Sequence, residues 1–353
     1  MKKVRAAIIG SGLIAGKKHI PAFLRLRSKI ELVAICDLNI AAAKQMAARF
    51  GIPSVYSNVA EMLSSQKPDF VDICTPPQTH PRLAIEAMRH GCHVLVEKPM
   101  ALTVADCDRI VQASQEHGLK VCVGHSDLFY EPFIKARRMV ANGAIGRVCG
   151  MRIFLSTPTE YMTSRAEHWA HKLPGGVIGE TGPHIVYMTL AFIPRIRMVN
   201  VDALKIMNDY PWSSFEDYRI NLIGDDAISS STVVYTTGEW AAKVEILGDK
   251  GFLFLDLESM NLVRYRRTQL KPVVVGLSLL SESAQLAGAF ISNSIRVATR
   301  RARSTHEIII SEFADSILEG SNPPVSAEEG REAVRVLNMV VENIESKFAT
   351  KNA

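Results

Sequence analysis

Short apolar segments alternate with stretches of helical periodicity over the first 125 residues, and this alternation limits the possible folds more than any other feature. Strands separated by helices form a parallel sheet with helices on both faces, so the pattern predicts a doubly wound sheet. Expected strands cover residues 4–9, 30–36, 54–56, 70–74, 91–96 and 120–123, and expected helices begin near residue 40 and cover 59–65, 81–90 and 104–117.

A glycine-rich turn follows the first expected strand. Its sequence is Gly10-Ser11-Gly12-Leu13-Ile14, and Ala15 comes next. The first glycine permits a tight turn, the second lets the backbone approach a pyrophosphate, and a small third residue packs the helix on the strand. The helix N-terminus offers N–H groups and partial positive charge to phosphates. The turn lies between a strand and a helix, as a dinucleotide site requires.

Asp37 ends the second expected strand. A carboxylate at this position accepts hydrogen bonds from the adenosine ribose hydroxyls and repels a 2′-phosphate. Because Leu38 and Asn39 follow, rather than an arginine, the sequence favours NAD over NADP. The alternative is that Asp37 caps the helix that begins near Ile40, and the two roles are compatible.

Two further strand ends carry distinctive residues, Thr75-Pro76 and Glu97-Lys98. A lysine at the end of a buried strand is costly unless its charge or proton is used, although a surface salt bridge is the simpler alternative. Ligands of parallel α/β sheets bind at the carboxyl ends of strands. We therefore expect these residues, the glycine turn and Asp37 to converge on one site.

The regular alternation stops after about residue 125, and six candidate strands follow between residues 148 and 257. Several of them alternate apolar and polar residues, as an antiparallel sheet with one buried face requires. A chain of 353 residues is long enough for two domains.

Composition narrows the class of protein. No run of about 20 apolar residues is expected to span a membrane, and the start of the chain leads directly into a strand rather than into an apolar signal segment. A cytoplasmic enzyme is therefore expected. The six cysteines lack metal-ligand spacing, so buried thiols and no metal site are expected. The net charge of +5 includes a late arginine cluster, for which an anionic substrate or a solvated face is favoured over nucleic acid.

Further motifs occur in a characteristic order. After the glycine turn come CTPPQTH at 74–80, EKP at 97–99, NGAIGRV at 142–148, GGVIGETGPH at 175–184 and PVSAEEG at 324–330. Together they resemble the glucose–fructose oxidoreductase, inositol dehydrogenase and rhizopine-catabolism (Gfo/Idh/MocA) family over nearly the whole chain. These motifs are specific for the family and poorly specific for the substrate.

The resemblance implies an α/β protein of two domains. Residues 1–125 would form a dinucleotide-binding Rossmann domain, and residues 126–353 a substrate-binding α/β domain with an open, mostly antiparallel sheet. That sheet often makes the oligomer interface in the family, so a homodimer or homotetramer is expected. Neither nucleic acid nor stable membrane association is expected.

The chemistry of alcohol oxidation requires a proton carrier near the reacting oxygen, and Lys98 and His184 are the candidates. Glu180 lies four residues before His184, so on a helix both point the same way, and the carboxylate holds the imidazole or contacts a substrate hydroxyl. The resemblance implies the same assignments. The chain departs from the family at Glu180, where aspartate is usual, at Tyr187, which replaces an acidic or amide residue, and at Leu128, near a frequent arginine.

The resemblance also assigns cofactor contacts. Thr75 and Pro76 should run along the nicotinamide ribose and the diphosphate, His80 should lie close to the cofactor, and Glu97 should approach the nicotinamide ribose. Trp169 resembles a family tryptophan near the nicotinamide, and a packed aromatic at the domain junction is an equal alternative.

These residues predict an NAD-dependent dehydrogenase or reductase that acts on a CH–OH group of a sugar, a cyclitol or a sugar derivative. One alternative is an enzyme that cleaves glycosides with the help of bound NAD. Another is a non-catalytic sugar or NAD sensor, against which the intact Lys98 and His184 argue.

Residues 271–303 are the least family-like segment. They read as a helix with apolar residues broadly on one side and a basic end. A subunit contact or a lid over the active site is favoured over a membrane-surface helix. A final amphipathic helix is expected over residues 328–347.

Overall fold

The structure, a computed structural model, describes residues 3–349. The chain divides into two compact units: Met1–Phe129 with Arg303–Arg335, and Tyr130–Ala302 with Val336–Ala353. The chain first passes from one unit to the other between Phe129 and Tyr130, close to the expected boundary after residue 125. A single boundary does not describe the chain, however, because a C-terminal segment returns to the first unit.

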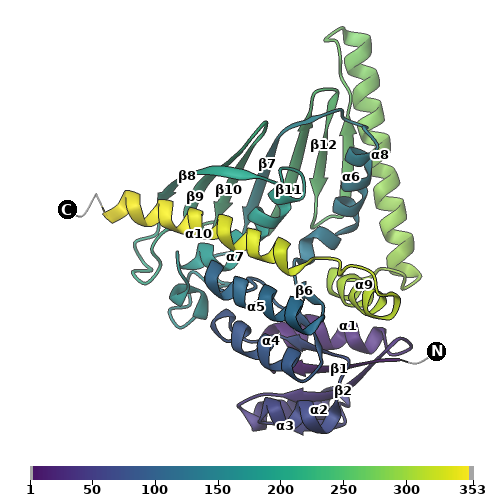
Figure 1. Cartoon of the computed structure of the whole chain (residues 1–353). Helices are drawn as coiled ribbons and strands as arrows, with labels where there is room; N and C mark the ends of the chain where they lie inside the picture. The colour runs from purple at the N-terminus through teal and green to yellow at the C-terminus, as the bar shows by residue number, and fades with distance from the viewer. Residues whose placement is uncertain (1–2, 350–353) are drawn as a thin grey trace. The chain divides into compact units, whose positions relative to one another are not determined.

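The first unit is built on a six-stranded sheet (Figure 1). Its strands are β1 (Val4–Ile9), β2 (Ile30–Cys36), β3 (Ser54–Tyr56), β4 (Phe70–Ile73), β5 (His93–Val96) and β6 (Val121–Val123). The spatial order is β3-β2-β1-β4-β5-β6, and every neighbouring pair is parallel. This is the Rossmann order, and it confirms the expected fold class.

Five helices of the first unit follow the predicted alternation, and a sixth, α9, comes from the C-terminal part of the chain. They are α1 (Ile20–Arg25), α2 (Ile40–Phe50), α3 (Val59–Gln66), α4 (His80–Arg89), α5 (Val104–His117) and α9 (Thr305–Glu319). The last of these belongs here because its apolar face is buried against α1 and β5. Phe313 of α9 is fully buried and packs edge-to-face on Phe70 of β4, with ring centroids 5.4 Å apart.

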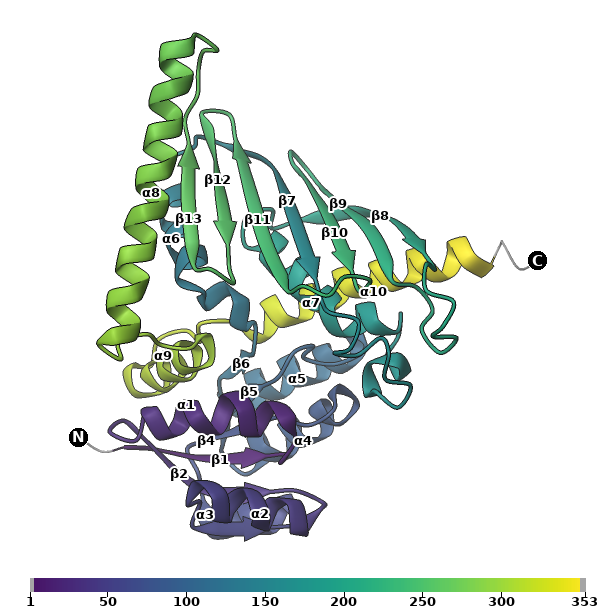
Figure 2. The same cartoon turned by 180° about the vertical axis from the view of Figure 1, so that it is seen from behind.

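The second unit holds a seven-stranded sheet (Figure 2). Its strands are β7 (Val148–Ser156), β8 (Ile196–Leu204), β9 (Asp217–Gly224), β10 (Ile228–Val234), β11 (Ala241–Gly248), β12 (Gly251–Asp256) and β13 (Asn261–Tyr265). The order is β13-β12-β11-β7-β10-β9-β8, in which only β7 and β10 pair in parallel among these described strands. The mostly antiparallel sheet is therefore confirmed, and β13 is a strand that the sequence analysis missed.

Helices α6 (Glu131–Ala141), α7 (Val177–Leu190), α8 (Pro272–Ala298) and α10 (Ala327–Ala349) complete the fold, and α10 enters the second unit at Val336. Helix α7 bonds to β10 through Thr189 and Ser229, 2.9 Å apart, and Asn343 of α10 accepts from the Val201 N–H at 2.9 Å. Helix α8 lies along the edge strand β13 (Figures 1 and 2). Five cysteines are buried, as expected, and Cys149 is exposed.

Candidate active site

The glycine turn after β1 has the predicted geometry. Gly10 has φ +107°, and a Cβ there would lie 2.6 Å from the carbonyl oxygen of Cys74, so the position requires glycine. A Cβ on Gly12 would meet nothing within 4 Å. Ala15 is fully buried in the apolar cluster of β1 and β2, and Ile14 packs against the same cluster. The turn therefore presents accessible backbone in front of a well-packed helix.

Asp37, at the carboxyl end of β2, holds this turn in place. Its Oδ2 accepts hydrogen bonds from the backbone N–H and the hydroxyl of Ser11, both at 2.7 Å. Its Oδ1 accepts from the Asn39 N–H at 2.8 Å. The cap of α2 is Asn39, whose side chain accepts from the Ala42 N–H at 3.1 Å, so the alternative assignment of that cap to Asp37 is wrong.

His80 ties together two segments that follow strands. Its Nδ1 lies 3.0 Å from the carbonyl oxygen of Pro99, and its Nε2 lies 2.8 Å from that of Thr75. The ring is fully buried, and burial lowers its pKa. His80 therefore positions the segment after β4 relative to Lys98-Pro99, and a direct contact with a cofactor stays a prediction.

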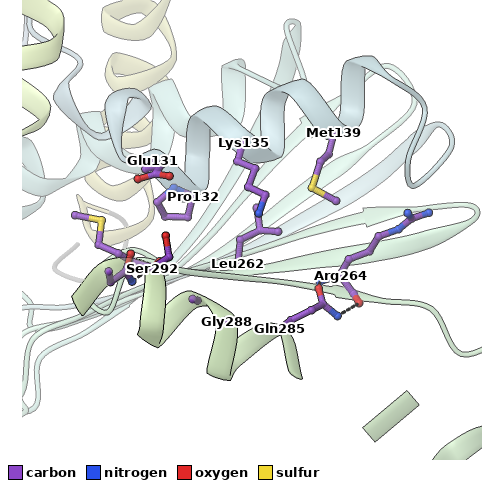
Figure 3. Close-up of a pocket in the computed structure, with 12 residues that line it drawn as sticks. Glu131, Pro132, Lys135, Met139, Leu262, Arg264, Gln285, Gly288 and Ser292 are labelled. Carbon is purple, nitrogen blue, oxygen red and sulfur yellow. Dashed lines mark hydrogen bonds between the residues drawn. The ribbon is translucent and has the colours of Figure 1, made fainter. Parts of the chain in front are cut away.

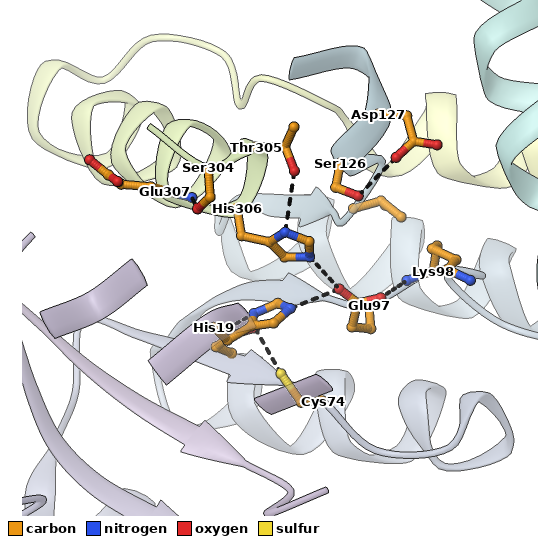
Figure 4. Close-up of polar contacts among 12 residues, drawn as sticks. His19, Cys74, Glu97, Lys98, Ser126, Asp127, Ser304, Thr305, His306 and Glu307 are labelled. Atoms are coloured by element: carbon orange, nitrogen blue, oxygen red, sulfur yellow. Dashed lines mark hydrogen bonds and ion pairs between the residues drawn. The ribbon is translucent and has the colours of Figure 1, made fainter. Parts of the chain in front are cut away.

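A buried hydrogen-bond network holds Glu97 (Figure 4). His19 places Nε2 2.8 Å from Glu97 Oε1 and Nδ1 2.7 Å from Asp72 Oδ2. His306 of α9 places Nε2 3.9 Å from the same Glu97 oxygen. The other oxygen of Glu97 accepts from the Lys98 N–H at 3.2 Å. The network therefore holds the backbone of Lys98, the candidate catalytic lysine, in place.

The charges in this network are set by its burial and its contacts. Burial opposes a charge on His19, but the interactions with Asp72 and Cys74 together outweigh it and raise the pKa of His19 well above 6.5. Burial would raise the pKa of Glu97, yet the hydrogen bond and charge of His19 lower it to about 2. Burial and the charge of His19 lower the pKa of His306 to about 3. At neutral pH a protonated His19 thus lies between two carboxylates, beside a neutral His306.

Two groups of potential metal ligands share His19, one with Glu97 and His306 and the other with Asp72 and Cys74. A doubly protonated imidazole has no lone pair to offer a metal ion. Since both nitrogens of His19 are engaged at hydrogen-bond distance with carboxylates, the geometry describes an ion-pair network.

Glu97 was predicted from the sequence, whereas His19, Asp72 and His306 were not. Asp72 carries a readable signal, because an acidic residue within the buried apolar strand β4 requires a partner. His19 and His306 have no comparable local signal. They are recognised only once α1 and α9 pack side by side.

In the second unit, α7 carries the predicted Glu180 and His184 pair. From Val177 to Thr189 every side chain of this helix is buried except these two, which are partly exposed. Residues four apart share a helix face, so the acid and the imidazole point the same way, as predicted. A Cβ on Gly179 would lie 2.5 Å from the carbonyl oxygen of Pro174, so the helix start has no room for a larger residue.

Tyr187 orients the imidazole of His184. Its hydroxyl lies 2.6 Å from His184 Nδ1, and the Tyr187 side chain is buried. Glu180 Oε2 accepts from the Thr181 hydroxyl at 3.2 Å. From the sequence alone, Tyr187 is only a departure from the family pattern. The structure shows that it engages the ring nitrogen that sets the histidine tautomer.

A partly exposed aromatic cluster neighbours α7 in the same unit. Trp169 is 45% exposed and stacks on His168, with ring centroids 5.8 Å apart. Tyr161 packs edge-to-face on Trp240 at 4.9 Å and lies 6.2 Å from His168. Burial lowers the pKa of His168, and the charge of Glu180 opposes this shift. Within its unit Trp169 is thus an accessible aromatic surface rather than a core residue.

The predicted site residues therefore fall into two sets. The first unit gathers one set at the carboxyl ends of β1, β2, β4 and β5, namely the glycine turn with Leu13, Asp37, Thr75, Pro76, Glu97 and Lys98. The second unit carries Trp169, Glu180 and His184. The first set fits a dinucleotide, because it combines a turn that a Cβ would block, an accessible backbone and an acidic side chain at the end of β2.

Comparison with known proteins identifies both units. Residues 4–125 match the model of the oxidoreductase family with an NAD-binding Rossmann fold, and residues 133–254 match the GFO/IDH/MocA C-terminal domain. D-glucoside 3-dehydrogenase of Escherichia coli is 32% identical over 57% of this chain and 58% of its own length. Inositol 2-dehydrogenase of Salmonella typhimurium is 28% identical over 46% of this chain and 50% of its own. The chain thus spans about half the length of the curated relatives it matches.

Solved structures agree on the fold. The WlbA dehydrogenase of Bordetella pertussis, solved with NADH and UDP-GlcNAcA, superposes with a TM-score of 0.80 at 21% identity over 98% of this chain and 96% of that one. An oxidoreductase domain protein of Kribbella flavida gives 0.81 at 22% identity over 98% of both chains. With the two family models, the motif order and the two sheets in agreement, this chain belongs to the GFO/IDH/MocA family of NAD-binding oxidoreductases.

Proposed function

We propose that the protein is an NAD-dependent dehydrogenase or reductase that moves a hydride between nicotinamide and a secondary alcohol of a sugar, cyclitol or sugar derivative. The observation that carries this proposal is the partly exposed Lys98 at the end of β5, held by Glu97 and its buried network at the same sheet edge as Asp37. The relatives named for glucoside and inositol support the substrate class. The accessible face of Trp169 suits the apolar face of a sugar ring.

Bound NAD would supply or accept the hydride. The residues of the chain supply the proton chemistry and the positioning. His184 takes or returns the proton of the alcohol, with its ring held by Tyr187. The ammonium group of Lys98 donates a hydrogen bond to the reacting oxygen and stabilises its developing charge. Glu180 accepts a hydrogen bond from a second substrate hydroxyl.

The test is NADH formation from a panel of sugars, polyols and nucleotide-linked sugars. On a positive substrate, Lys98→Met should abolish turnover and leave NAD affinity within a few-fold. His184→Ala should slow turnover by about 10²- to 10⁴-fold. Lys44→Met, which changes an exposed lysine of α2, is the control and should behave like the wild type.

Unchanged turnover in Lys98→Met or His184→Ala would refute the assigned roles. Glycoside cleavage without net NADH would indicate the NAD-assisted cleaving enzyme. Sugar and NAD binding without any turnover on the panel would indicate a sensor.

We also propose a homodimer or homotetramer joined through the outward face of the second sheet. That face exposes Met198, Ile228 and Phe252 at 59%, 48% and 36% on three strands. Sedimentation of the wild type and of Ile228→Lys tests the proposal, because a charge in an apolar interface should shift the protein to a smaller species. A wild-type monomer would contradict it.

A further inference from the structure

Helix α8 is amphipathic, but its apolar face is exposed and its polar face contacts the protein, which is the opposite of the usual arrangement in a soluble domain. Its large apolar side chains point away from the sheet, and most of its area is exposed even though the helix is 27 residues long. We call the exposed side the outer face of α8, and its exposed fractions range from 56% to 73% for Val273, Leu277, Leu280, Phe290, Ile291 and Ile295. Monomeric soluble proteins seldom expose so continuous an apolar surface.

The side of α8 that faces the protein is polar (Figure 3). Gln285 accepts from the Arg264 N–H of β13 at 2.9 Å and donates to its carbonyl oxygen at 3.2 Å. Asn293 donates to the carbonyl oxygen of Met260 at 3.2 Å. A cavity of about 350 Å³ lies between α6, β13 and α8, and Lys135 is among the residues that line it. The helix is therefore fixed to the sheet edge by hydrogen bonds, and its apolar surface is directed outward.

Basic residues lie at both ends of the outer face. Arg266 and Lys271 precede the helix, and Arg300 and Arg301 follow it, and all four are exposed. Glu282 is the one acidic residue within α8, and it is paired with Arg267 at 3.1 Å on the inner side. An apolar stripe flanked by positive charge complements a surface that is apolar inside and anionic outside.

We propose that α8 is an interfacial anchor that binds this enzyme reversibly to an anionic lipid surface, with its axis in the plane of the membrane. The outer face enters the boundary between headgroups and acyl chains, and the basic residues at its two ends contact anionic headgroups. The proposal rests on the second unit alone and does not depend on the proposed reaction.

A second copy of the chain fits this surface less well. In a parallel helix pair the basic ends meet basic ends, and in an antiparallel pair Arg266 and Lys271 meet Arg300 and Arg301, so both arrangements bring like charges together. The exposed apolar arc also includes Leu279, Leu286 and Val297 and covers roughly half of the helix circumference. One partner helix would cover only a narrower stripe of that arc.

Spanning a membrane is the other possibility, since α8 is long and apolar enough by length and composition alone. The expectation that the chain has no apolar run able to span a membrane therefore does not hold for length and composition, although serines, Glu282 and Gln285 interrupt this run. A spanning helix would have to give up the polar contacts of Gln285 and Asn293 and carry those groups into hydrocarbon. Binding in the plane of the membrane keeps all of them.

Flotation of the full-length protein with vesicles tests the proposal. We expect binding to phosphatidylcholine vesicles that contain about 30% phosphatidylglycerol, weaker binding to pure phosphatidylcholine, and release by salt. The double variant Phe290→Gln with Ile291→Gln should lower the partition coefficient more than about 100-fold. The variant Arg300→Gln with Arg301→Gln should lower it roughly 30-fold.

Matched control variants remove exposed apolar side chains and exposed positive charges outside α8. Leu24→Gln with Leu318→Gln changes two exposed apolar residues, and Arg27→Gln with Arg89→Gln removes two exposed charges. Both should float like the wild type. All variants should keep the wild-type unfolding temperature, because the altered side chains are exposed.

Several results would overturn the proposal. One is that the wild type does not float with anionic vesicles, and another is that the control variants lose as much vesicle binding as the α8 variants. Resistance to extraction with alkaline carbonate would indicate a spanning helix. A smaller oligomer for Phe290→Gln with Ile291→Gln, without vesicle binding by the wild type, would show that a second copy covers the outer face.

Discussion

At the scale of single residues, the candidate site depends on side chains that hold other side chains in place. Tyr187 holds His184, His80 holds two strand-end segments, and Asp37 holds the glycine turn. Side chains that are held by such contacts lose less conformational freedom when a ligand binds.

Tyr187→Phe should separate positioning from proton transfer. Loss of one hydrogen bond to the imidazole should lower kcat about 3- to 10-fold and shift the pH profile of kcat, with KM nearly unchanged. Tyr210→Phe, which alters a tyrosine on a loop of the second unit, is the control. If the pH profile of Tyr187→Phe overlays that of the wild type, Tyr187 does not set the histidine tautomer.

Asp37→Ser tests the choice of cofactor. The wild type should bind NAD more tightly than NADP, because a 2′-phosphate would face a carboxylate. The serine should narrow this gap, and adding Leu38→Arg should narrow it further, as calorimetric titration of both cofactors would show. Asn39→Ala removes the cap of α2 instead, so it should cost about 1 kcal/mol of stability and leave the preference unchanged. Equal affinities in the wild type would refute the assignment.

At the scale of elements, α7 shows how a helix can be nearly all buried and still present a site. Its first turn passes so close to the preceding segment that Gly179 faces Pro174 and Leu173. This close approach fixes the direction in which the partly exposed Glu180 and His184 leave the helix.

Gly179→Ala should destabilise the protein by about 1 to 3 kcal/mol, because the added methyl group meets a backbone carbonyl that cannot move away. Gly276→Ala is the matched control in α8, where a Cβ would meet nothing within 4 Å. It should stabilise the protein slightly, by up to about 1 kcal/mol, through helix propensity. Denaturant unfolding of both variants gives the comparison, and similar effects in the two would contradict this reading of α7.

At the scale of the whole molecule, the C-terminal part of the chain completes the first unit. Helix α9 brings His306 to the network of His19, Asp72 and Glu97, so residues from both ends of the chain share one set of charges. The folding of this unit therefore depends on pH through a small number of buried groups.

The protein should be most stable near pH 6.5. The pKa of Glu97 is about 2 against 4.5, so its contribution is present above pH 4.5 and is lost as the pH falls toward 2. The pKa of His306 is about 3 against 6.5, so stability rises with pH between these values, by up to about 1.4 kcal/mol per pH unit. The raised pKa of His19 adds stability below pH 6.5 that is lost as the pH rises through its folded value.

Thermal unfolding between about pH 4 and pH 8 measures this profile. His306→Asn should remove part of the rise on the acid side, and the buried His80, whose pKa is also lowered, should keep the rest. His117→Asn changes an exposed histidine at the end of α5 and should keep that rise. If the unfolding temperature of His306→Asn rises with pH on the acid side as steeply as that of the wild type, the buried His306 does not titrate as described.

Local sequence patterns were sufficient to predict part of the fold and part of the candidate site. The strand and helix alternation, the glycine turn and the acidic and basic residues at strand ends predicted the Rossmann sheet and one half of the site, because parallel strands with right-handed connections leave few arrangements. The helical spacing of Glu180 and His184 was likewise confirmed.

Contacts between groups that are distant in the sequence became visible only in the folded structure. The edge strand β13, the return of α9 and the contacts of His19 and His306 were not predicted, because a periodic pattern shows which face of an element is apolar and not what that face contacts. Helix α8 illustrates the limit most clearly. The sequence predicted an apolar side for this helix. Whether that side faces the sheet or is exposed is determined by polar contacts on the opposite side, which Gln285 and Asn293 make with β13 and with Met260 just before it.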